Sequence, residues 1–346
     1  MNEAQPHGQT KGLDAEFDPV LYHDWHPVAA SAQLPSGQLQ AARLLGRELV
    51  LWRDANATVH GWEDRCPHRG TRLSLGSLVQ CDGQDLLVCR YHGWGFDASA
   101  RCRQVPAQPE LPPPPAAVVQ AYAVCECYGL IWICLGEPAA PVAPFPEYAH
   151  PALRKVLCGP YEVVSSGPRI VENFLDMAHF GFVHAGILGD PERAAIADYQ
   201  VAALAGGGII ATDCLAWQPQ TNTLAHQGSE VAYTYRVLRP LTAILTKQPH
   251  AQPDFHEAIS LHVQPLEETR SRVWITLALT NFSQTEVELR AFQDRIFTQD
   301  LLILENQTPQ KLPLRLGAEQ SVRSDRLSLA YRAWLRELGL RWGVIT

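Results

Sequence analysis

The sequence predicts an α+β protein in which a small all-β domain precedes an antiparallel sheet with helices packed on it. Its 346 residues exceed the length of one average domain. A proline-rich stretch from Pro138 to Pro151 separates short strand-like runs from a region where such runs alternate with amphipathic helices. This order of elements is typical of an α+β fold. We therefore expect one domain over residues 1–150 and a second over residues 151–346.

The first region, from Ala41 to Ile133, carries short strand patterns. Pro112–Pro115 is expected to form a surface connection, because proline lacks the N–H that a helix interior or a central strand requires. A turn is expected at Asp54–Ala57. The predicted strands, which are rich in apolar residues, are Ala42–Trp52, Thr58–Trp62, Leu86–Tyr91, Val118–Val124 and Leu130–Leu135.

The second region combines strands with longer helices. Apolar residues at helical spacing predict helices over Ile170–Phe182, Gln284–Glu305 and Ser328–Glu337. Gly206–Gly208 is expected to form a turn between two strands. The other strand-like runs are Val231–Val237, Ala258–Val263 and Arg272–Leu279.

Charge and apolar patterning exclude several classes of protein. The net charge of −8 argues against nucleic-acid binding, because phosphates require a basic surface. No run of about 18 apolar residues occurs, so no membrane-spanning helix is predicted. Met1–Asp18 is polar and shows no secretory signal. Nine cysteines, an odd number, form a poor disulfide framework, and we expect a reducing, cytoplasmic location.

Two short motifs in the first region each carry one cysteine and one histidine. Cys66 and His68 lie in the first motif, and Cys89 and His92 lie in the second. A zinc-stabilised binding module is one interpretation, because two cysteines and two histidines satisfy tetrahedral zinc. Zinc fingers of that composition pair like residues in sequence, whereas here the two types alternate. Alternation is expected where two loops each send one ligand to each of two irons, as in a Rieske [2Fe–2S] cluster.

The motifs resemble the Rieske family signature. They stand here as Cys-Pro-His-Arg-Gly and Cys-Arg-Tyr-His-Gly-Trp. The resemblance implies a [2Fe–2S] cluster held by Cys66, His68, Cys89 and His92. Gly70 follows the first motif closely and Gly93 the second, and glycine lets backbone N–H groups approach the cluster sulfurs.

A second set of candidate ligands lies in the predicted helix over Ile170–Phe182. Asp176 and His179 are three residues apart and share a helix face. His184 lies five residues beyond His179, which turns it off that face on a regular helix. Both histidines can bind one metal only if the helix bends or ends near Gly181. The alternative interpretation is that they are two unrelated histidines on a partly buried helix.

A two-histidine iron site needs one carboxylate to complete a facial triad. Advancing about 100° per residue along the predicted helix over Gln284–Glu305 places Asp300 within an apolar stripe. Asp294 and Glu305 fall on the opposite side. An isolated buried charge is costly, so Asp300 must be paired, protonated or metal-bound, and we select it as the third ligand. The stripe itself consists of Leu289, Phe292, Ile296 and Ile303.

The whole chain then resembles the Rieske oxygenases. Their pattern D-x2-H-x4-H is matched by Asp176, His179 and His184, and their distant aspartate by Asp300. The resemblance implies a helix-grip catalytic domain with one mononuclear Fe(II), dioxygen as co-substrate and a homotrimer. In that trimer Asp176 is expected to bridge His92 of one subunit to His179 of the next. Asn173 resembles a family asparagine near the iron, although a polar residue of the helix start is an equal interpretation.

The electron source is expected to be a separate protein. The sequence contains no flavin or nicotinamide fingerprint and no plant-type ferredoxin segment, so NAD(P)H is expected to act only through a separate reductase or ferredoxin. Four arginines near the cluster motifs could dock an acidic ferredoxin, and a solvated loop surface explains them equally well. They are Arg65, Arg69, Arg72 and Arg90.

The resemblance favours a terminal oxygenase that monohydroxylates a small organic molecule. The runs Leu51–Asp54 and Ser324–Gly339 are similar to small-molecule hydroxylases such as those of saxitoxin biosynthesis. Oxidative N-demethylases of purine alkaloids and O-demethylases of methoxyaromatics are similar in layout, so demethylation is the alternative. A Rieske electron-transfer protein would not need His179, His184 and Asp300. The sequence does not identify the substrate.

Overall fold

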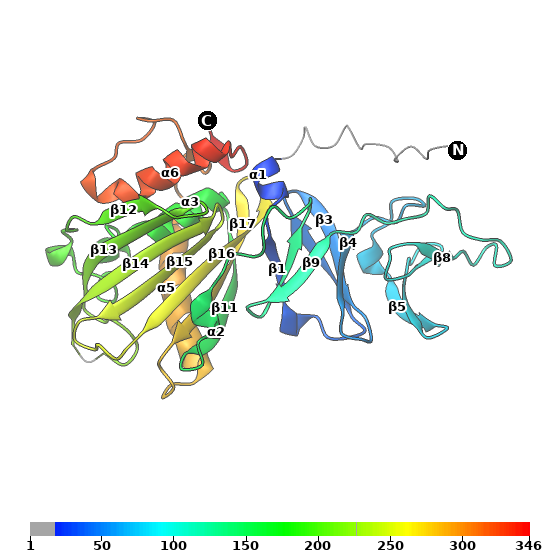
Figure 1. Cartoon of the computed structure of the whole chain (residues 1–346), viewed down its shortest axis with the longest axis horizontal. Coiled ribbons are helices and arrows are strands. Elements are labelled where there is room, and N and C mark those ends of the chain that lie inside the picture. The colour runs from blue at the N-terminus through cyan, green and yellow to red at the C-terminus, as the bar shows by residue number, and fades with distance from the viewer. Residues whose placement is uncertain (1–17, 226) are drawn as a thin grey trace.

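The computed structural model describes residues 18–225 and 227–346. The N-terminal region consists of small antiparallel sheets, and one large sheet with helices forms the C-terminal region (Figure 1). The predicted α+β class is therefore confirmed. No helix in the described ranges is long and apolar enough to cross a bilayer.

Three antiparallel sheets form the N-terminal region, in the orders β1-β10-β9, β2-β3-β4 and β5-β6-β7-β8. Two 3-10 helices, η1 (Ser31–Gln33) and η2 (Leu73–Leu75), and a short helix, α1 (Pro19–Tyr22), complete it. The strands are β1 (His26–Ala30), β2 (Leu39–Leu44), β3 (Arg47–Arg53), β4 (Val59–Glu63), β5 (Ser77–Cys81), β6 (Gln84–Val88), β7 (Gly95–Phe96), β8 (Cys102–Gln104), β9 (Ala123–Cys127) and β10 (Leu130–Cys134).

Three predicted strands of this region differ from the structure. The run Leu86–Tyr91 is a strand only as far as Val88, where β6 ends and the second cysteine–histidine motif begins. The run Ala42–Trp52 is divided between β2 and β3, because Leu45 and Gly46 adopt positive φ angles and turn the chain. The run Val118–Val124 is a strand only from Ala123 onward, and its earlier part forms isolated bridges to Arg101 and Trp62. Apolar composition predicted these runs, but it does not report where the chain reverses.

The C-terminal region is built on a seven-stranded antiparallel sheet of order β11-β17-β16-β15-β14-β13-β12. Successive strands from β12 to β17 are neighbours, and β11 joins at the edge beside β17. Side chains of β14 alternate between buried and partly exposed, as a sheet with one covered face requires. The strands are β11 (Arg154–Val163), β12 (Gln200–Ala203), β13 (Ile209–Gln218), β14 (Ser229–Arg239), β15 (Thr242–Pro249), β16 (Glu257–Glu267) and β17 (Arg270–Leu279).

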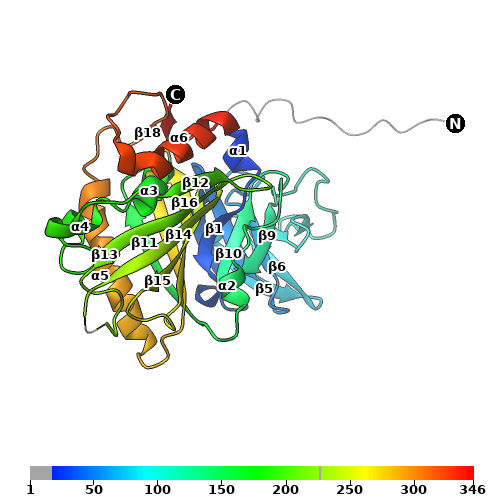
Figure 2. The ribbon, with the colours of Figure 1, turned by 60° about the vertical axis from the view of Figure 1, so that its left-hand side comes forward.

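Helices α3 and α5 pack against the large sheet, and α6 lies beside α3 and the β12–β13 end (Figure 2). A capping box of Thr285 and Glu288 begins α5. The other helices and two minor strands of this region are shorter than α5. All helices and minor strands of the region are α2 (Pro146–Ala149), α3 (Gly167–Leu175), α4 (Phe180–Val183), η3 (Pro191–Arg193), α5 (Glu286–Leu304), β18 (Leu312–Pro313), η4 (Arg323–Asp325), α6 (Arg326–Leu338) and β19 (Val344–Ile345).

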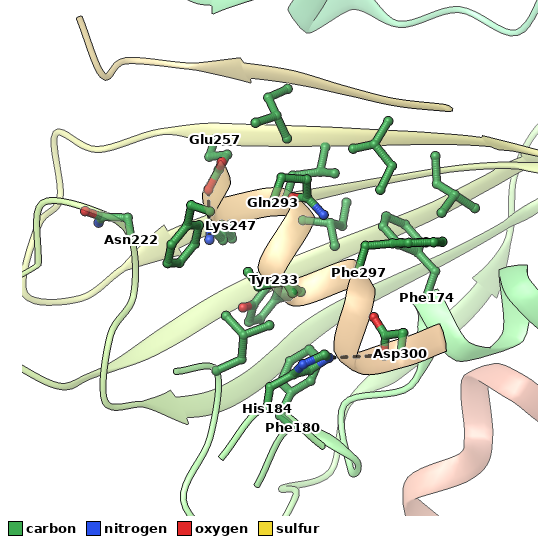
Figure 3. Close-up of a pocket in the computed structure, with 18 of the residues that line it drawn as sticks. Phe174, Phe180, His184, Asn222, Tyr233, Lys247, Glu257, Gln293, Phe297 and Asp300 are labelled. Carbon is green, nitrogen blue, oxygen red and sulfur yellow. Dashed lines mark ion pairs between the residues drawn. The ribbon is translucent and has the colours of Figure 1, made fainter. Parts of the chain in front are cut away.

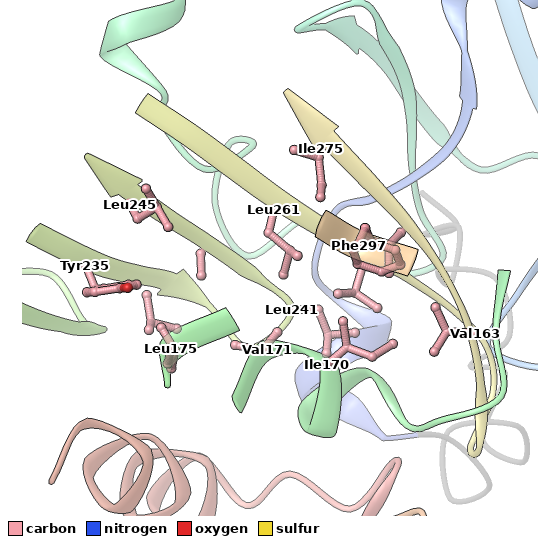
Figure 4. Packing of buried hydrophobic residues seen from close by; sticks show 14 of the residues in the cluster. Val163, Ile170, Val171, Leu175, Tyr235, Leu241, Leu245, Leu261, Ile275 and Phe297 are labelled. Atoms are coloured by element: carbon pink, nitrogen blue, oxygen red, sulfur yellow. The ribbon is translucent and has the colours of Figure 1, made fainter. Parts of the chain in front are cut away.

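The main hydrophobic core lies between α3, α5 and the sheet. Figure 4 shows Ile170, Val171 and Leu175 of α3 facing side chains that rise from the strands. Phe297 of α5 stacks on Tyr161 of β11 with ring centroids 4.3 Å apart. This packing holds both helices in fixed positions over the sheet, which matters because the candidate ligands lie on or next to them.

The two regions are joined by direct contacts and not only by the connecting chain. The turn between β2 and β3 hydrogen-bonds to the end of β16, since Leu45 N–H donates to the Pro265 carbonyl at 2.7 Å. Trp132 of β10 packs with Trp274 of β17 in one buried cluster. The rings of Trp132 and His262 also form a T-shaped contact, with their centroids 4.9 Å apart. Burial lowers the pKa of His262 to about 3, so its ring is neutral inside this contact.

Trp132→Ala should destabilise the protein strongly. Removing a fully buried aromatic side chain leaves a cavity between the two regions, and we expect the free energy of unfolding to fall by roughly 3–5 kcal/mol. Urea denaturation followed by circular dichroism measures it. Phe282→Ala removes an aromatic side chain that is 63% exposed and should change the value by less than about 0.5 kcal/mol. Equal losses in both variants would contradict the assigned role of Trp132.

Candidate metal centres

The cysteine–histidine motifs lie in two loops with the same hydrogen-bond pattern. In the first loop the Cys66 carbonyl accepts from Gly70 N–H at 2.9 Å, and Cys66 N–H donates to the Thr71 carbonyl at 2.8 Å. In the second loop Cys89 is bonded in the same way to Gly93 and Trp94, at 2.9 Å in each case. Gly70 has φ +72° and Gly93 has φ +71°. Both loops therefore need the left-handed conformation that glycine adopts without strain.

These loops bring the four predicted cluster residues together in two pairs. The thiols of Cys66 and Cys89 interact and are buried in the small N-terminal core. The rings of His68 and His92 lie 4.6 Å apart nearer the surface. The indole of Trp94 stacks on His68 at 4.4 Å with an interplanar angle of 3°. Buried thiols on one side and outward imidazoles on the other fit a two-iron cluster with unlike ligands on its two irons.

Burial and the cysteine pair affect protonation at this site. Burial raises the pKa of the Cys66 thiol to about 11. A thiol with this pKa stays protonated at neutral pH, so the positive charge of bound iron would be needed to favour the thiolate. Exposed arginines flank the loops, as the sequence predicts; they are Arg65, Arg69, Arg72 and Arg90.

The helix predicted over Ile170–Phe182 is interrupted, and the break lies earlier than expected. Helix α3 ends at Leu175, Asp176 is extended with ψ 134°, and a separate short helix α4 begins at Phe180. A helix end near Gly181 is present as well, as predicted, because α4 ends at Val183 and His184 is its C-cap. Gly181 also allows close approach of another segment, because a Cβ there would lie 3.0 Å from the Asp190 carbonyl.

Asp176 itself stabilises the break. One of its carboxylate oxygens accepts from the N–H of Ala178 at 2.9 Å, and the other from the N–H of His179 at 3.3 Å. These bonds turn the backbone after α3, in the manner of an aspartate that competes with helical hydrogen bonding. The predicted pairing of Asp176 with His179 exists, but through this turn and not across one helix face.

Both histidine rings are oriented by a partner on Nδ1. His179 Nδ1 lies 3.0 Å from the Asp176 carboxylate. His184 Nδ1 lies 2.9 Å from the side-chain carbonyl oxygen of Gln299, one residue before Asp300 on α5. Donation from Nδ1–H to each oxygen leaves the lone pair of Nε2 free on both rings. Both Nε2 atoms then face the same point.

The Nε2 atoms of His179 and His184 both face the carboxylate of Asp300. Its Oδ1 lies 3.2 Å from His184 Nε2 and 3.5 Å from His179 Nε2. Asn173, on the last turn of α3, donates to the same oxygen at 3.3 Å. Ligand atoms of His179, His184 and Asp300 all lie within 4.8 Å of one another. The structure thus brings together the three residues selected from the sequence, and it places Asn173 beside them.

The electrostatics of this group favour a positive charge at its centre. Burial by itself lowers the pKa of His184, but hydrogen bonding and attraction to the Asp300 carboxylate outweigh it, and the pKa is raised. Burial likewise opposes ionisation of Asp176, yet its bonds to His179 keep the pKa of Asp176 below the usual value. Two imidazole nitrogens and one buried carboxylate, preferring a cation between them, suit Fe(II) with open positions left over.

The buried face of α5 is rotated from the predicted stripe. Ile303 was placed in the stripe, but it is 40% exposed. Gln293, Phe297 and Leu304 are buried instead, and Phe297 stacks on Tyr161 of β11. Asp300 lies on the buried face in both descriptions, and Asp294 and Glu305 are exposed as predicted.

A pocket opens directly in front of His184 and Asp300 (Figure 3). It contains about 930 Å³ of empty space, including its opening to solvent. Phe174 and Phe180 line it beside the candidate ligands, and aliphatic side chains of the sheet line its walls. A few polar side chains gather at the other end. A mostly apolar cavity with a few converging polar groups is typical of a small-molecule site.

Family models match both regions. The Rieske [2Fe-2S] domain matches residues 24–122, and the vanillate O-demethylase oxygenase C-terminal domain matches residues 165–341. The chain belongs to the Rieske non-heme iron oxygenase family. A member of this family is a terminal oxygenase that carries a Rieske cluster and a mononuclear iron and uses dioxygen. The second match is not expected of a Rieske electron-transfer protein or a zinc-stabilised module, so both alternatives are rejected.

Several relatives of this Rieske oxygenase are N-demethylases. The methylxanthine N1-demethylase of Pseudomonas putida is 31% identical over 92% of this chain and 89% of the relative. A protein of Pseudomonas sp. (strain TJI-51) named "Probable methylxanthine N7-demethylase NdmC" is 40% identical over 62% of this chain and 77% of the relative. The structure of Pseudomonas putida CBB5 NdmA with caffeine superposes with a TM-score of 0.80 at 28% identity, covering 92% and 91% of the two chains.

Three polar residues near this oxygenase's candidate site were not predicted. Gln299 orients His184, and Lys247 and Glu257 pair with each other in the pocket at 2.8 Å. A polar residue next to Asp300 could have drawn attention to Gln299. The ion pair depends on the register of β15 and β16, and β15 was not predicted as a strand.

Gln299→Leu should weaken iron binding at the mononuclear site. Without an acceptor for Nδ1–H, His184 loses the bond that fixes its ring and tautomer, and we expect about 10–100-fold weaker iron affinity. Iron retention during chelator challenge, read by metal analysis, measures this. Gln299→Glu keeps an acceptor oxygen and should retain iron like the unaltered protein. Indistinguishable retention by the leucine variant would remove Gln299 from this role. The visible absorption of the cluster should be unchanged in both variants.

Proposed function

We propose that this chain is the oxygenase component of an oxidative N-demethylase for methylxanthine-like heterocycles. The 40% identity to the probable N7-demethylase carries the proposal, and the pocket beside the candidate iron ligands supports it. Demethylation is a monooxygenase reaction: one oxygen atom enters a C–H bond of the N-methyl group, and the second leaves as water with two electrons and two protons. The resulting N-hydroxymethyl group then breaks its N–C bond and releases formaldehyde.

His179, His184 and Asp300 are proposed as the iron ligands. When bound there, the iron supplies dioxygen activation with electrons from the cluster. The chain contributes orientation and a dry environment: Phe174 and Phe180 line the pocket next to the ligands and exclude water from the reacting methyl group. Asn173 holds the Asp300 carboxylate through its 3.3 Å bond and is proposed as a positioning residue.

Cys66 and Cys89 are proposed as ligands of one cluster iron, and His68 and His92 of the other. The cluster loops and the α4–α5 site lie at opposite ends of the chain (Figures 1 and 2). Because the cluster loops are far from the candidate iron ligands of the same chain, we propose that electrons pass between chains in a head-to-tail homotrimer. His92 is exposed, as contact with a neighbour requires. Asp176 is proposed to bridge His92 of one subunit to His179 of the next.

A separate reductase or ferredoxin is proposed as the electron donor, with NAD(P)H acting through it. An oxidoreductase of Pseudomonas putida, NdmD, is 44% identical over 34% of this chain, and the chain covers 19% of that relative. The exposed arginines around the cluster loops suit an acidic partner. No disulfide joins any of the nine cysteines, all of which lie in the described ranges, and this supports the proposed cytoplasmic location.

The domain division at residues 1–150 and 151–346 also belongs to this proposal. The last strand of the N-terminal region, β10, ends at Cys134, and the first strand of the large sheet, β11, begins at Arg154. The chain between them contains the proline-rich stretch and only the short helix α2. Contacts of β1 and β2 with β16 support a division into two domains that pack on each other.

The purified protein, with a Rieske-oxygenase reductase and NADH, should convert 7-methylxanthine to xanthine. We expect one formaldehyde for each dioxygen consumed in coupled turnover, measured by mass spectrometry and a formaldehyde assay. Asp300→Asn should abolish both products while the cluster spectrum remains, because a carboxylate ligand is lost. A product that gains oxygen and keeps its methyl group would assign the chain to simple hydroxylation instead.

Asp176→Asn should leave both metals bound and lower turnover by at least about 100-fold. The amide keeps the shape of the side chain but cannot provide the charged, hydrogen-bonded link between His179 and the neighbouring cluster. Iron content and cluster absorption serve as controls. Single-turnover reduction of the cluster should stay fast, since it precedes the altered step. Normal steady-state activity in this variant would exclude the bridging role.

A further inference from the structure

The end of the pocket away from His184 and Asp300 contains a buried ion pair. Lys247 and Glu257 are direct cross-strand partners on β15 and β16, and Lys247 Nζ lies 2.8 Å from a Glu257 carboxylate oxygen. The side chains are only 5% and 9% exposed. Figure 3 shows them at one end of the cavity, with Gln293 of α5 close by and the iron-ligand candidates at the other end.

This polar end retains unused hydrogen-bonding capacity. Besides Glu257, Lys247 Nζ donates to the Thr221 carbonyl at 3.1 Å, which leaves one of its three protons free. The second oxygen of Glu257 accepts from no group within residues 18–225 and 227–346. Gln293 is 8% exposed, and its side chain lines the same pocket. Together the three side chains offer spare donors and acceptors inside one cavity.

Such an arrangement is costly in a folded protein unless a ligand uses it. Replacing a buried ion pair by apolar residues is often neutral or stabilising. Leu279, Phe255 and Phe292 also line this pocket, so apolar surface surrounds the ion pair. The pair carries no net charge, so it suits a neutral ligand edge that presents a carbonyl beside an N–H.

We propose that Lys247, Glu257 and Gln293 recognise the carbonyl and N–H groups of the substrate ring on the side away from the reacting methyl group. This rests on the proposed function and deepens it. Lys247 donates to a ring carbonyl, Glu257 accepts from a ring N–H, and Gln293 pairs with the remaining carbonyl or N–H. A substrate whose distal nitrogens carry methyl groups leaves Glu257 without a donor. The pocket therefore selects singly N-methylated diones over fully methylated ones.

Two probes that share the reacting methyl group test the selection. 7-Methylxanthine has N–H groups on its dione ring, and 1,3,7-trimethylxanthine has none. Binding to the holoenzyme without reductase is measured by calorimetry, so no turnover occurs. We expect roughly 10- to 100-fold tighter binding of 7-methylxanthine, the range for one buried polar group gained or lost. Lys247→Met/Glu257→Met removes both charges at once, and the preference should fall below about threefold.

A second Lys–Glu pair provides the matched control. Lys311 and Glu268 form an ion pair outside the pocket, and Lys311→Met/Glu268→Met should leave the preference unchanged. Glu257→Gln keeps an acceptor oxygen and should preserve a reduced preference, which tests the idea even if the double variant folds poorly. An unchanged preference in both Glu257 variants overturns the recognition role while the demethylase function stands. If neither xanthine binds the unaltered holoenzyme, both the function and this inference are overturned.

Discussion

The candidate iron site depends on the break between α3 and α4. His179 lies at the start of α4 and His184 at its end, so both histidines follow this break. The Asp176 carboxylate accepts two backbone N–H groups just after α3 and holds the backbone extended. The chain after the break places α4 so that the Nε2 atoms of both histidines face Asp300 of α5. One short side chain thus fixes the backbone and also orients a ring that it contacts through Nδ1.

Packing of two helices against one sheet completes this geometry. Phe297 of α5 stacks on β11, and α3 fills the space between α5 and the central strands. Asp300 and His184 therefore occupy fixed positions on elements that are far apart in sequence. The strands that face the helices also form the walls of the pocket. The residues that pack against the helices and the residues that line the pocket are consequently neighbours on the same strands.

Much of the architecture follows from local patterns, but the turns and orientations do not. The bounds of helix α5 agree closely with the prediction, because the capping box that begins it is a local feature. Strand β15 was missed, since nearly every side chain in it is buried and no alternation remains. Asp300 lies on the buried face of α5 in the prediction and in the structure, although the two faces are rotated relative to each other. Its selection required only that Asp300 be buried. Gln299 and the Lys247–Glu257 pair depend on tertiary placement and strand register, which no single segment encodes.

The contact between the β2–β3 turn and the end of β16 has a consequence for synthesis of the chain. Leu45 and Gly46 hydrogen-bond to Pro265 and Leu266, which leave the ribosome more than 200 residues later. Until then, the apolar surface around Trp132 has no partner from the large sheet. The N-terminal region therefore keeps an exposed hydrophobic surface until the ribosome has synthesised most of the chain. Nascent chains stalled before β16 are the species in which this surface is open to chaperones.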